Sequence, residues 1–168
     1  MGWWTRSAGR ECSSGRTLVT GRLSVSNADW DHPSPHVIEL QVHAADIDAY
    51  NHVNNSVYLA WFDRVAWSHS AQLGISLERC LELRRGMAAH RTQIDYLRAA
   101  VLGDRVSVGT WIVSTDNRLR VTRRFQVLRD ADHEVLARAS TDYVCINLDS
   151  GRATRMPELF ARSYTVTS

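Results

Sequence analysis

Residues 46–58, with the sequence DIDAYNHVNNSVY, decide the fold of this chain. Two carboxylates, one histidine and three amides lie within the first ten residues of this motif. Polar side chains this dense before a helix either cap the helix or form an active site. The sequence on both sides of the motif helps to separate these two interpretations.

A strand precedes the motif and a long helix follows it. Ile38, Leu40 and Val42 alternate with polar residues, which is typical of a half-buried strand. After the motif, apolar residues recur at helical spacing and predict a helix over 56–73, with Gly74 as the residue that ends it. The apolar stripe of this helix comprises Val57, Tyr58, Trp61, Phe62, Val65, Ala66 and Leu73.

The remainder of the chain predicts a short helix, four strands and a final short helix. The short helices are expected over 76–83 and from Pro157, and turn residues such as Gly103-Asp104 separate the strands. Short links favour antiparallel neighbours, so we expect a five-stranded antiparallel sheet wrapped around the long helix, an α+β fold. The four strands are predicted at Met87–Arg98, Arg105–Ser114, Arg118–Leu128 and Val135–Asn147.

The first 35 residues differ from the rest. They are rich in Ser, Gly, Thr and Arg and show no sustained periodicity, so we expect an irregular N-terminal extension over 1–35 and one domain over 36–168. A short strand at Thr17–Val25 is one option within this extension. Trp3 and Trp4 could pack on the domain or on a neighbouring subunit.

Composition excludes several classes of protein. The formal net charge is only +2, which gives no bias toward nucleic acid or membrane partners, although all 20 basic residues are Arg. No apolar run approaches the roughly 20 residues of a membrane helix. Cys12, Cys80 and Cys145 have neither pairing nor metal-ligand spacing, and the N-terminus lacks a secretory pattern, so we expect a cytoplasmic protein without a metal.

The motif with its flanking strand and helix resembles the hot-dog fold thioesterases. The pattern Asp-x-x-x-His-Val-Asn-Asn-x-x-Tyr is similar to the 4-hydroxybenzoyl-CoA thioesterase family and its acyl-CoA hydrolase branch, and residues 94–100 with Gly103-Asp104 resemble that family's second-strand signature. The resemblance covers roughly residues 36–160. It implies a hot-dog fold, a thioesterase activity that needs no cofactor, and an active site at a subunit interface.

The resemblance also implies roles for particular residues. Asp48 takes the position of the acid that attacks the thioester or activates water, and the Asn55 N–H takes the position that polarises the thioester oxygen. This is chemically reasonable, because helix N-termini present unpaired N–H groups to a developing oxyanion. His52 matches the assisting histidine of the plant acyl-carrier-protein thioesterases. Tyr50 and Asn51 depart from the family patterns.

Substrate-binding residues are less strongly indicated. Tyr58 and Trp61 could line an acyl pocket or simply belong to the core. Arg118 and Arg120 share one strand face with Thr122 and Arg124, and this face could bind the CoA phosphates or merely be solvated. A rival phosphate site is formed by Arg84 and Arg85.

These features predict an enzyme that hydrolyses an acyl-CoA thioester to free acid and CoA, working as a homodimer or homotetramer. Hydrolysis of an acyl-carrier-protein thioester is an alternative, and a non-catalytic acyl-CoA binding module is another. A dehydratase is disfavoured because the matching His/Asp signature is missing. The acyl chain length, and the choice between nucleophile and general base for Asp48, stay open at this level.

Overall fold

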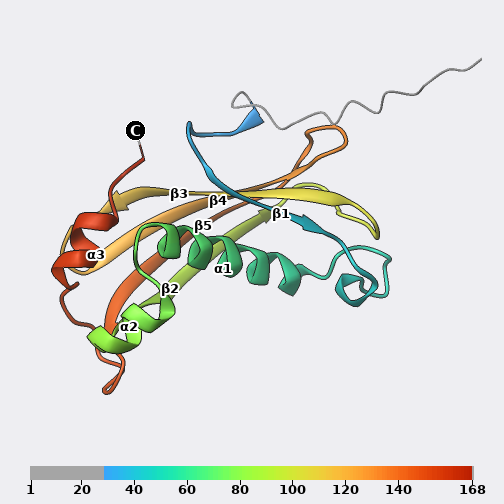
Figure 1. Cartoon of the computed structure of the whole chain (residues 1–168). Helices are drawn as coiled ribbons and strands as arrows, with labels where there is room; N and C mark the ends of the chain where they lie inside the picture. Colours follow the sequence, from blue (N-terminus) through green and yellow to red (C-terminus); the bar gives the residue numbers. More distant parts are fainter. Residues whose placement is uncertain (1–28, 168) are drawn as a thin grey trace, which may run out of the picture.

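The computed structural model describes residues 29–167, in which one long helix packs against a five-stranded antiparallel sheet (Figure 1). The predicted α+β architecture is therefore confirmed. No helix in this part of the chain is long and apolar enough to cross a membrane. The elements are β1 (His36–Gln41), a 3-10 turn η2 (Ala44–Asp46), α1 (Asn55–Gln72), α2 (Leu77–Leu83), β2 (Arg85–Tyr96), β3 (Arg105–Thr115), β4 (Arg120–Arg129), β5 (Val135–Asn147) and α3 (Glu158–Ser163).

Local capping chemistry determines where α1 begins and ends. The Asn54 side chain accepts a hydrogen bond from the Ser56 backbone N–H at 2.9 Å, which satisfies one of the N–H groups that a helix start leaves unpaired. At the other end Gly74 has a φ of +83°, a left-handed conformation that glycine adopts without strain. Both ends of the helix lie within one residue of the bounds that the sequence predicts.

The pairing of β2 differs from the prediction. The sequence predicts that β2 and β3 are hairpin neighbours, which is wrong: β2 pairs with β5, and the sheet order is β1-β3-β4-β5-β2. The link 97–104 crosses the end of the sheet, where backbone hydrogen bonds join it to other segments. Ala100 O accepts from Val53 N at 2.9 Å, and Asp104 O accepts from Val42 N at 2.9 Å.

The core of the described residues consists of two apolar clusters. The larger one joins the first half of α1 to β3, β4 and β5, and the smaller one joins α2 and α3 to the other end of the sheet. Buried polar side chains lie along α1 and the strands as well, among them Ser70, Thr110 and Thr141. Arg123 is a buried cation in this set, with 3% of its surface exposed.

A segment at the start of the described chain covers the outer face of the sheet. The Trp30 ring packs on Gly109 and lies edge-on to Trp111, with 5.7 Å between ring centroids. Asp31 pairs with the Arg138 guanidinium at 2.5 Å. Residues 29–35 of the predicted extension thus run irregularly over β3, β4 and β5, while Trp3, Trp4, Cys12 and the optional strand at 17–25 lie outside the described residues.

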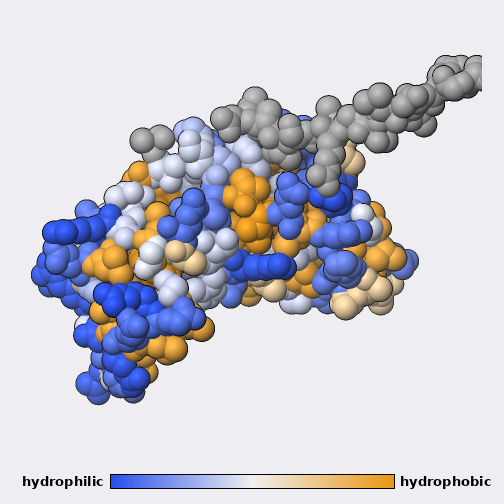
Figure 2. Space-filling model, in the orientation of Figure 1, coloured by the Kyte–Doolittle hydropathy of each residue, from blue (hydrophilic) through white to orange (hydrophobic). Residues whose placement is uncertain are grey.

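Some large apolar side chains stay exposed on the helices. They include Leu59 and Trp67 on α1 and Leu77 and Leu81 on α2. On the face that Figure 2 shows, apolar residues form separate areas between hydrophilic ones. Isolated apolar residues are normal on a protein surface, so they carry no functional conclusion by themselves.

Candidate active site

The motif folds into a closed loop that leads directly into α1. Ile47 and Val53 form an isolated antiparallel bridge, and Asn54 N donates to Asp46 O at 2.8 Å. Beyond this bridge the chain turns tightly between Asp48 and His52, and Asn51 within this turn has a positive φ. Because the two sides are bonded together, the turn is held next to the start of the helix.

Within this loop Asp48 is held through one of its two carboxylate oxygens. Asp48 Oδ1 accepts from Tyr50 N at 2.8 Å and from His52 N at 3.3 Å, an Asx-type turn. In residues 29–167 both hydrogen bonds of this carboxylate fall on Oδ1, which leaves Oδ2 open. Asp48 is half-buried, and the bridge between Ile47 and Val53 holds its loop next to the helix start.

The helix start supplies groups that can stabilise negative charge. Asn55 is the first residue of α1, and an N–H in the first turn has no acceptor within the helix. The Asn55 carbonyl accepts from the Tyr96 hydroxyl at 3.0 Å, which ties the end of β2 to the helix start. Asn55 N–H and Asp48 Oδ2 are thus complementary groups, one able to polarise a carbonyl and the other able to attack or take a proton.

The remaining polar residues of the motif divide into structural and exposed ones. The Asp46 carboxylate accepts from His43 N at 2.8 Å and caps the 3-10 turn. His52 is exposed, and its contacts with Asp48 are made by backbone atoms rather than by the imidazole. Tyr50 is 81% exposed at the tip of the loop. A catalytic role for His52 stays a prediction.

The two aromatic residues of the predicted substrate site are buried. Tyr58 and Trp61 are tilted against each other with 4.9 Å between ring centroids, and both belong to the larger core cluster. The Tyr58 hydroxyl accepts from Ala100 N at 3.2 Å, so it links the helix to the second signature segment. Burial is the largest cause that raises the pKa of Tyr58, which keeps the phenol neutral. Their position favours the core interpretation.

The two arginines of the predicted phosphate site lie far from Asp48 within one chain. Arg120 begins β4, whereas the helix start is tied to Tyr96 at the end of β2. Tyr96 pairs with Ala137 on β5, and Ala137 pairs in turn with Val127 on β4. Seven residues of strand separate Arg120 from Val127, which is about 23 Å. Arg118 is exposed in the preceding turn. A CoA-binding role for Arg118 and Arg120 stays a prediction.

The rival phosphate site is partly neutralised. The Arg84 guanidinium pairs with the Asp149 carboxylate, and Arg85 donates to the Arg84 carbonyl at 2.9 Å. Arg84 itself ends α2 in a left-handed conformation with a φ of +52°. These contacts give both side chains a structural role at the junction of α2 and β2.

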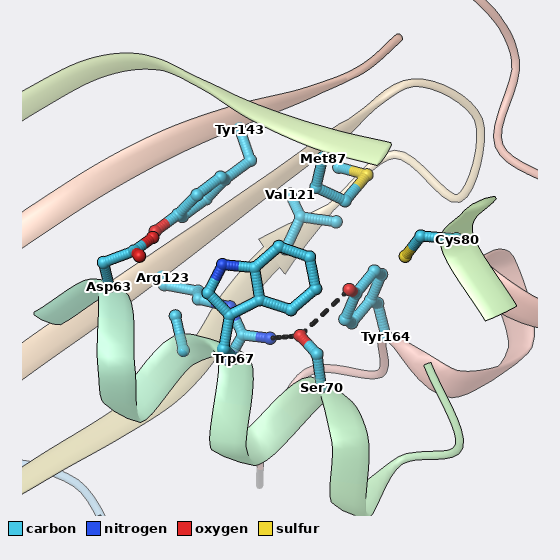
Figure 3. A pocket seen from close by; sticks show the side chains of 10 residues that line it. Asp63, Trp67, Ser70, Cys80, Met87, Val121, Arg123, Tyr143 and Tyr164 are labelled. Carbon is cyan, nitrogen blue, oxygen red and sulfur yellow. Dashed lines mark hydrogen bonds between the residues drawn. The ribbon is translucent and has the colours of Figure 1, made fainter. Parts of the chain in front are cut away.

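A pocket that the sequence analysis does not single out lies between α1 and the sheet (Figure 3). It is lined by apolar side chains together with Asp63, Ser70, Arg123, Tyr143 and Tyr164. Burial raises the pKa of Asp63 and raises that of Tyr143 to about 12. The signal that could have found this pocket is an arginine at position 123, in phase with apolar residues of β4.

Metal ligation finds no support in the part of the chain that the structure describes. No group of three or more His, Cys, Asp and Glu side chains there could hold a metal ion. Cys80 and Cys145 are free and buried, and burial raises the pKa of Cys145 to about 11. A buried thiol with a raised pKa is a poor nucleophile, so neither cysteine is a candidate for covalent catalysis.

Solved structures with a similar fold include proteins that are named as thioesterases. A 1,4-dihydroxy-2-naphthoyl-CoA thioesterase from Synechocystis superposes with a TM-score of 0.70 at 23% identity, covering 78% of this chain and 96% of that one. A Staphylococcus aureus protein in complex with CoA gives a TM-score of 0.72 at 22% identity, covering 77% and 81%. These matches confirm the hot-dog fold.

A sequence relative and a family model complete the comparison. The long-chain acyl-CoA thioesterase FadM of Escherichia coli K12 is 24% identical over 115 residues, which are 68% of this chain and 86% of FadM. The model of the thioesterase-like superfamily matches residues 42–163, the span that holds both the motif loop and the whole sheet after β1. The chain therefore belongs to the thioesterase-like superfamily.

Proposed function

We propose that this protein hydrolyses acyl-CoA thioesters to a free acid and CoA at the junction of the motif loop and α1. The observation that carries the proposal is the Asp48 carboxylate, whose Oδ1 is bonded to its own loop while Oδ2 stays open beside the helix start. Support also comes from FadM, which is named as an acyl-CoA thioesterase, and from the fold match to a protein in complex with CoA.

The proposed chemistry uses both groups of the junction. The thioester carbonyl oxygen lies at the Asn55 N–H, where the positive end of the helix dipole stabilises the developing oxyanion. Asp48 either takes a proton from the attacking water or attacks the carbonyl carbon itself. The carbon–sulfur bond then breaks, the CoA sulfur receives a proton, and water supplies the oxygen of the acid product.

The test is a pair of isosteric variants. Asp48→Asn keeps an oxygen that can accept from Tyr50 N and His52 N, so the loop is preserved and only the acidic function is lost. We expect kcat for the best acyl-CoA to fall by about 10²–10⁴-fold. Asp46→Asn is the matched control, because its side-chain oxygen can still cap the 3-10 turn, and it is expected to keep full activity. Full activity in Asp48→Asn would refute the assignment.

We also propose that the working unit contains a second copy of the chain. β2 is a twelve-residue edge strand, and long unpaired edges need a partner or a cover. Its last residue, Tyr96, touches the helix start and is 44% exposed, and the link that follows β2 also exposes Leu97, Val101 and Leu102. Pairing along β2 would cover these side chains. Sedimentation analysis tests this, with a monomer at micromolar concentration as the contradicting result.

Two exposed arginines leave an acyl-carrier-protein substrate as the alternative to acyl-CoA. Arg118 and Arg120 are exposed, and no ion pair joins either of them to a carboxylate within residues 29–167. Such cations suit CoA phosphates and equally suit an acidic carrier protein. Comparing kcat/KM for the same acyl group on CoA and on a carrier protein separates the two, and Arg120→Gln should raise KM only for the true carrier.

A further inference from the structure

Arg123 is a cation placed inside the molecule. It lies on β4 in phase with Val121 and Phe125, so its side chain enters the space between the sheet and α1. Its guanidinium contacts His69 Nδ1 at 2.8 Å and donates to Ser70 Oγ at 3.0 Å. The guanidinium carbon also lies 5.4 Å from the centre of the Tyr164 ring.

None of these partners balances the positive charge. No ion pair involves Arg123 in residues 29–167, and the serine and tyrosine partners are neutral. The pKa of His69 is lowered to about 4, chiefly by burial, so this ring is a neutral acceptor at pH 7. A buried charge without a counterion is costly, and an apolar side chain of similar size would usually serve stability better. Stability alone therefore does not account for an arginine here.

A small pocket of about 40 Å³ adjoins the guanidinium (Figure 3). Asp63, Trp67 and Ser70 face it from α1, while Arg123 and Tyr143 face it from the sheet. Trp67 is 41% exposed, so the pocket is reached from the surface along this side of α1. A cavity of this size holds a small group such as a carboxylate, and because the pocket opens beside Trp67, the rest of a ligand would lie along this exposed ring.

We propose that this pocket binds an organic carboxylate, whose charged group pairs with Arg123 while its apolar body packs against Trp67 and Met87. An arginine has five N–H donors in a planar fork that matches a carboxylate, and His69 and Ser70 engage only part of them. Asp63 sets the orientation of the bound ligand. It lies two helical turns from Ser70 on the same face of α1, and its carboxylate repels a ligand carboxylate at that end of the pocket.

The geometry also limits where this carboxylate comes from. Asn55 and Ser70 are separated by fifteen residues of helix, which is about 22 Å. The carboxylate at Arg123 is therefore not the one released at the Asn55 N–H of the same chain. It is either the far end of a long acyl group or a separate acid, and only the first source rests on the proposed function.

Calorimetric titration of the full chain at pH 8 tests the site without any turnover. The probes are octanoate and benzoate, each compared with its uncharged primary amide. We expect each carboxylate to bind at least about tenfold more tightly than its amide, because a charged hydrogen-bonded pair is formed. Equal affinities, or no binding of either carboxylate, would overturn the proposal.

Three variants sharpen this measurement. Arg123→Gln should abolish the preference for the carboxylate, whereas Arg124→Gln should keep it, because Arg124 lies on the other face of the same strand beside His32. Asp63→Asn should bind carboxylates several-fold more tightly, since a repelling charge is removed. This last variant tests the site even if Arg123→Gln does not fold, and unchanged or weaker binding in it would contradict the proposed orientation.

A second experiment distinguishes the two sources. KM is compared for a long-chain acyl-CoA that ends in a carboxylate and for its methyl-ended counterpart. A lower KM for the carboxylate form that disappears in Arg123→Gln assigns the site to the acyl group. Carboxylate binding in the calorimeter without this KM difference assigns it to a separate acid. If the protein hydrolysed none of these acyl-CoA substrates, the proposed function would be refuted, whereas the calorimetric result for the Arg123 site would still hold.

Discussion

Acid should destabilise this protein through His69. The Nδ1 atom of His69 lies 2.8 Å from Arg123 Nη1, and its ring stacks on His36 with 5.0 Å between centroids. Burial, followed by Arg123 and His36, lowers the pKa of His69 from 6.5 to about 4. In the unfolded chain the ring titrates near its ordinary value, so the two states take up this proton at different pH.

The size and the sign of the effect follow from that difference. The pKa of the folded state is the lower one, so the unfolded state binds the proton first as pH falls. The contribution of His69 to the free energy of unfolding is fully present above pH 6.5 and is lost between pH 6.5 and about 4. A shift of about 2.5 units corresponds to about 3 kcal/mol, and partial exposure of the ring reduces this to about 1–3 kcal/mol.

The assay is urea unfolding at several pH values between 7.5 and 4, for the wild type and for His69→Asn. Asparagine places an acceptor oxygen near the position of Nδ1 and does not titrate, so other acid effects cancel in the comparison. The wild type should lose about 1–3 kcal/mol more than the variant over this range. A difference between the two proteins that stays constant with pH would refute the reasoning, as would a His69 pKa near 6.5 measured by NMR.

Two further substitutions test packing and hydrogen-bond contacts that hold the fold together. Gly109→Ala would place a methyl group 2.6 Å from the Trp30 ring, so we expect a loss of about 1–3 kcal/mol in unfolding free energy. Trp30→Ala should remove most of this penalty in the double variant, and full additivity would contradict the contact. Tyr58→Phe removes the acceptor of the Ala100 N–H and should lower the stability by about 1–3 kcal/mol, which denaturant unfolding measures. An unchanged midpoint in Tyr58→Phe would mean that this N–H has another acceptor.

The structure of the motif loop and of the helix start, which we propose as the reaction centre, was predictable because its signals are local. The polar motif, the caps at Asn54 and Gly74, and the apolar stripe of α1 are all carried by neighbouring residues. For the same reason β5 has the bounds Val135–Asn147 that its alternation predicts. Asp48 and Asn55 are seven residues apart, so a single tight loop is enough to place both at the helix start.

The pocket was not predictable in the same way because its residues come together from six parts of the chain, among them α1, β4 and the segment after α3. Asp63 and Ser70 lie on α1, Arg123 on β4, and Tyr164 follows α3. Arg118, Arg120 and Arg124 form a regular stripe on one predicted strand face. The structure instead buries Arg123, which lies between two of them in the sequence. Strand periodicity assigns faces, but it does not tell which face receives the helix.

The sequence by itself determined the fold class, the order of the elements and the acid at the start of α1, because periodicity, capping and turn chemistry act between residues close in the chain. Only the tertiary structure decided that β2 pairs with β5 and that residues 29–33 cover the outer face of the sheet. It also decided that Arg123 is enclosed, with no counterion among residues 29–167. These outcomes depend on contacts between distant segments, which compete for the same sheet edges and faces and are settled only when the whole core is packed.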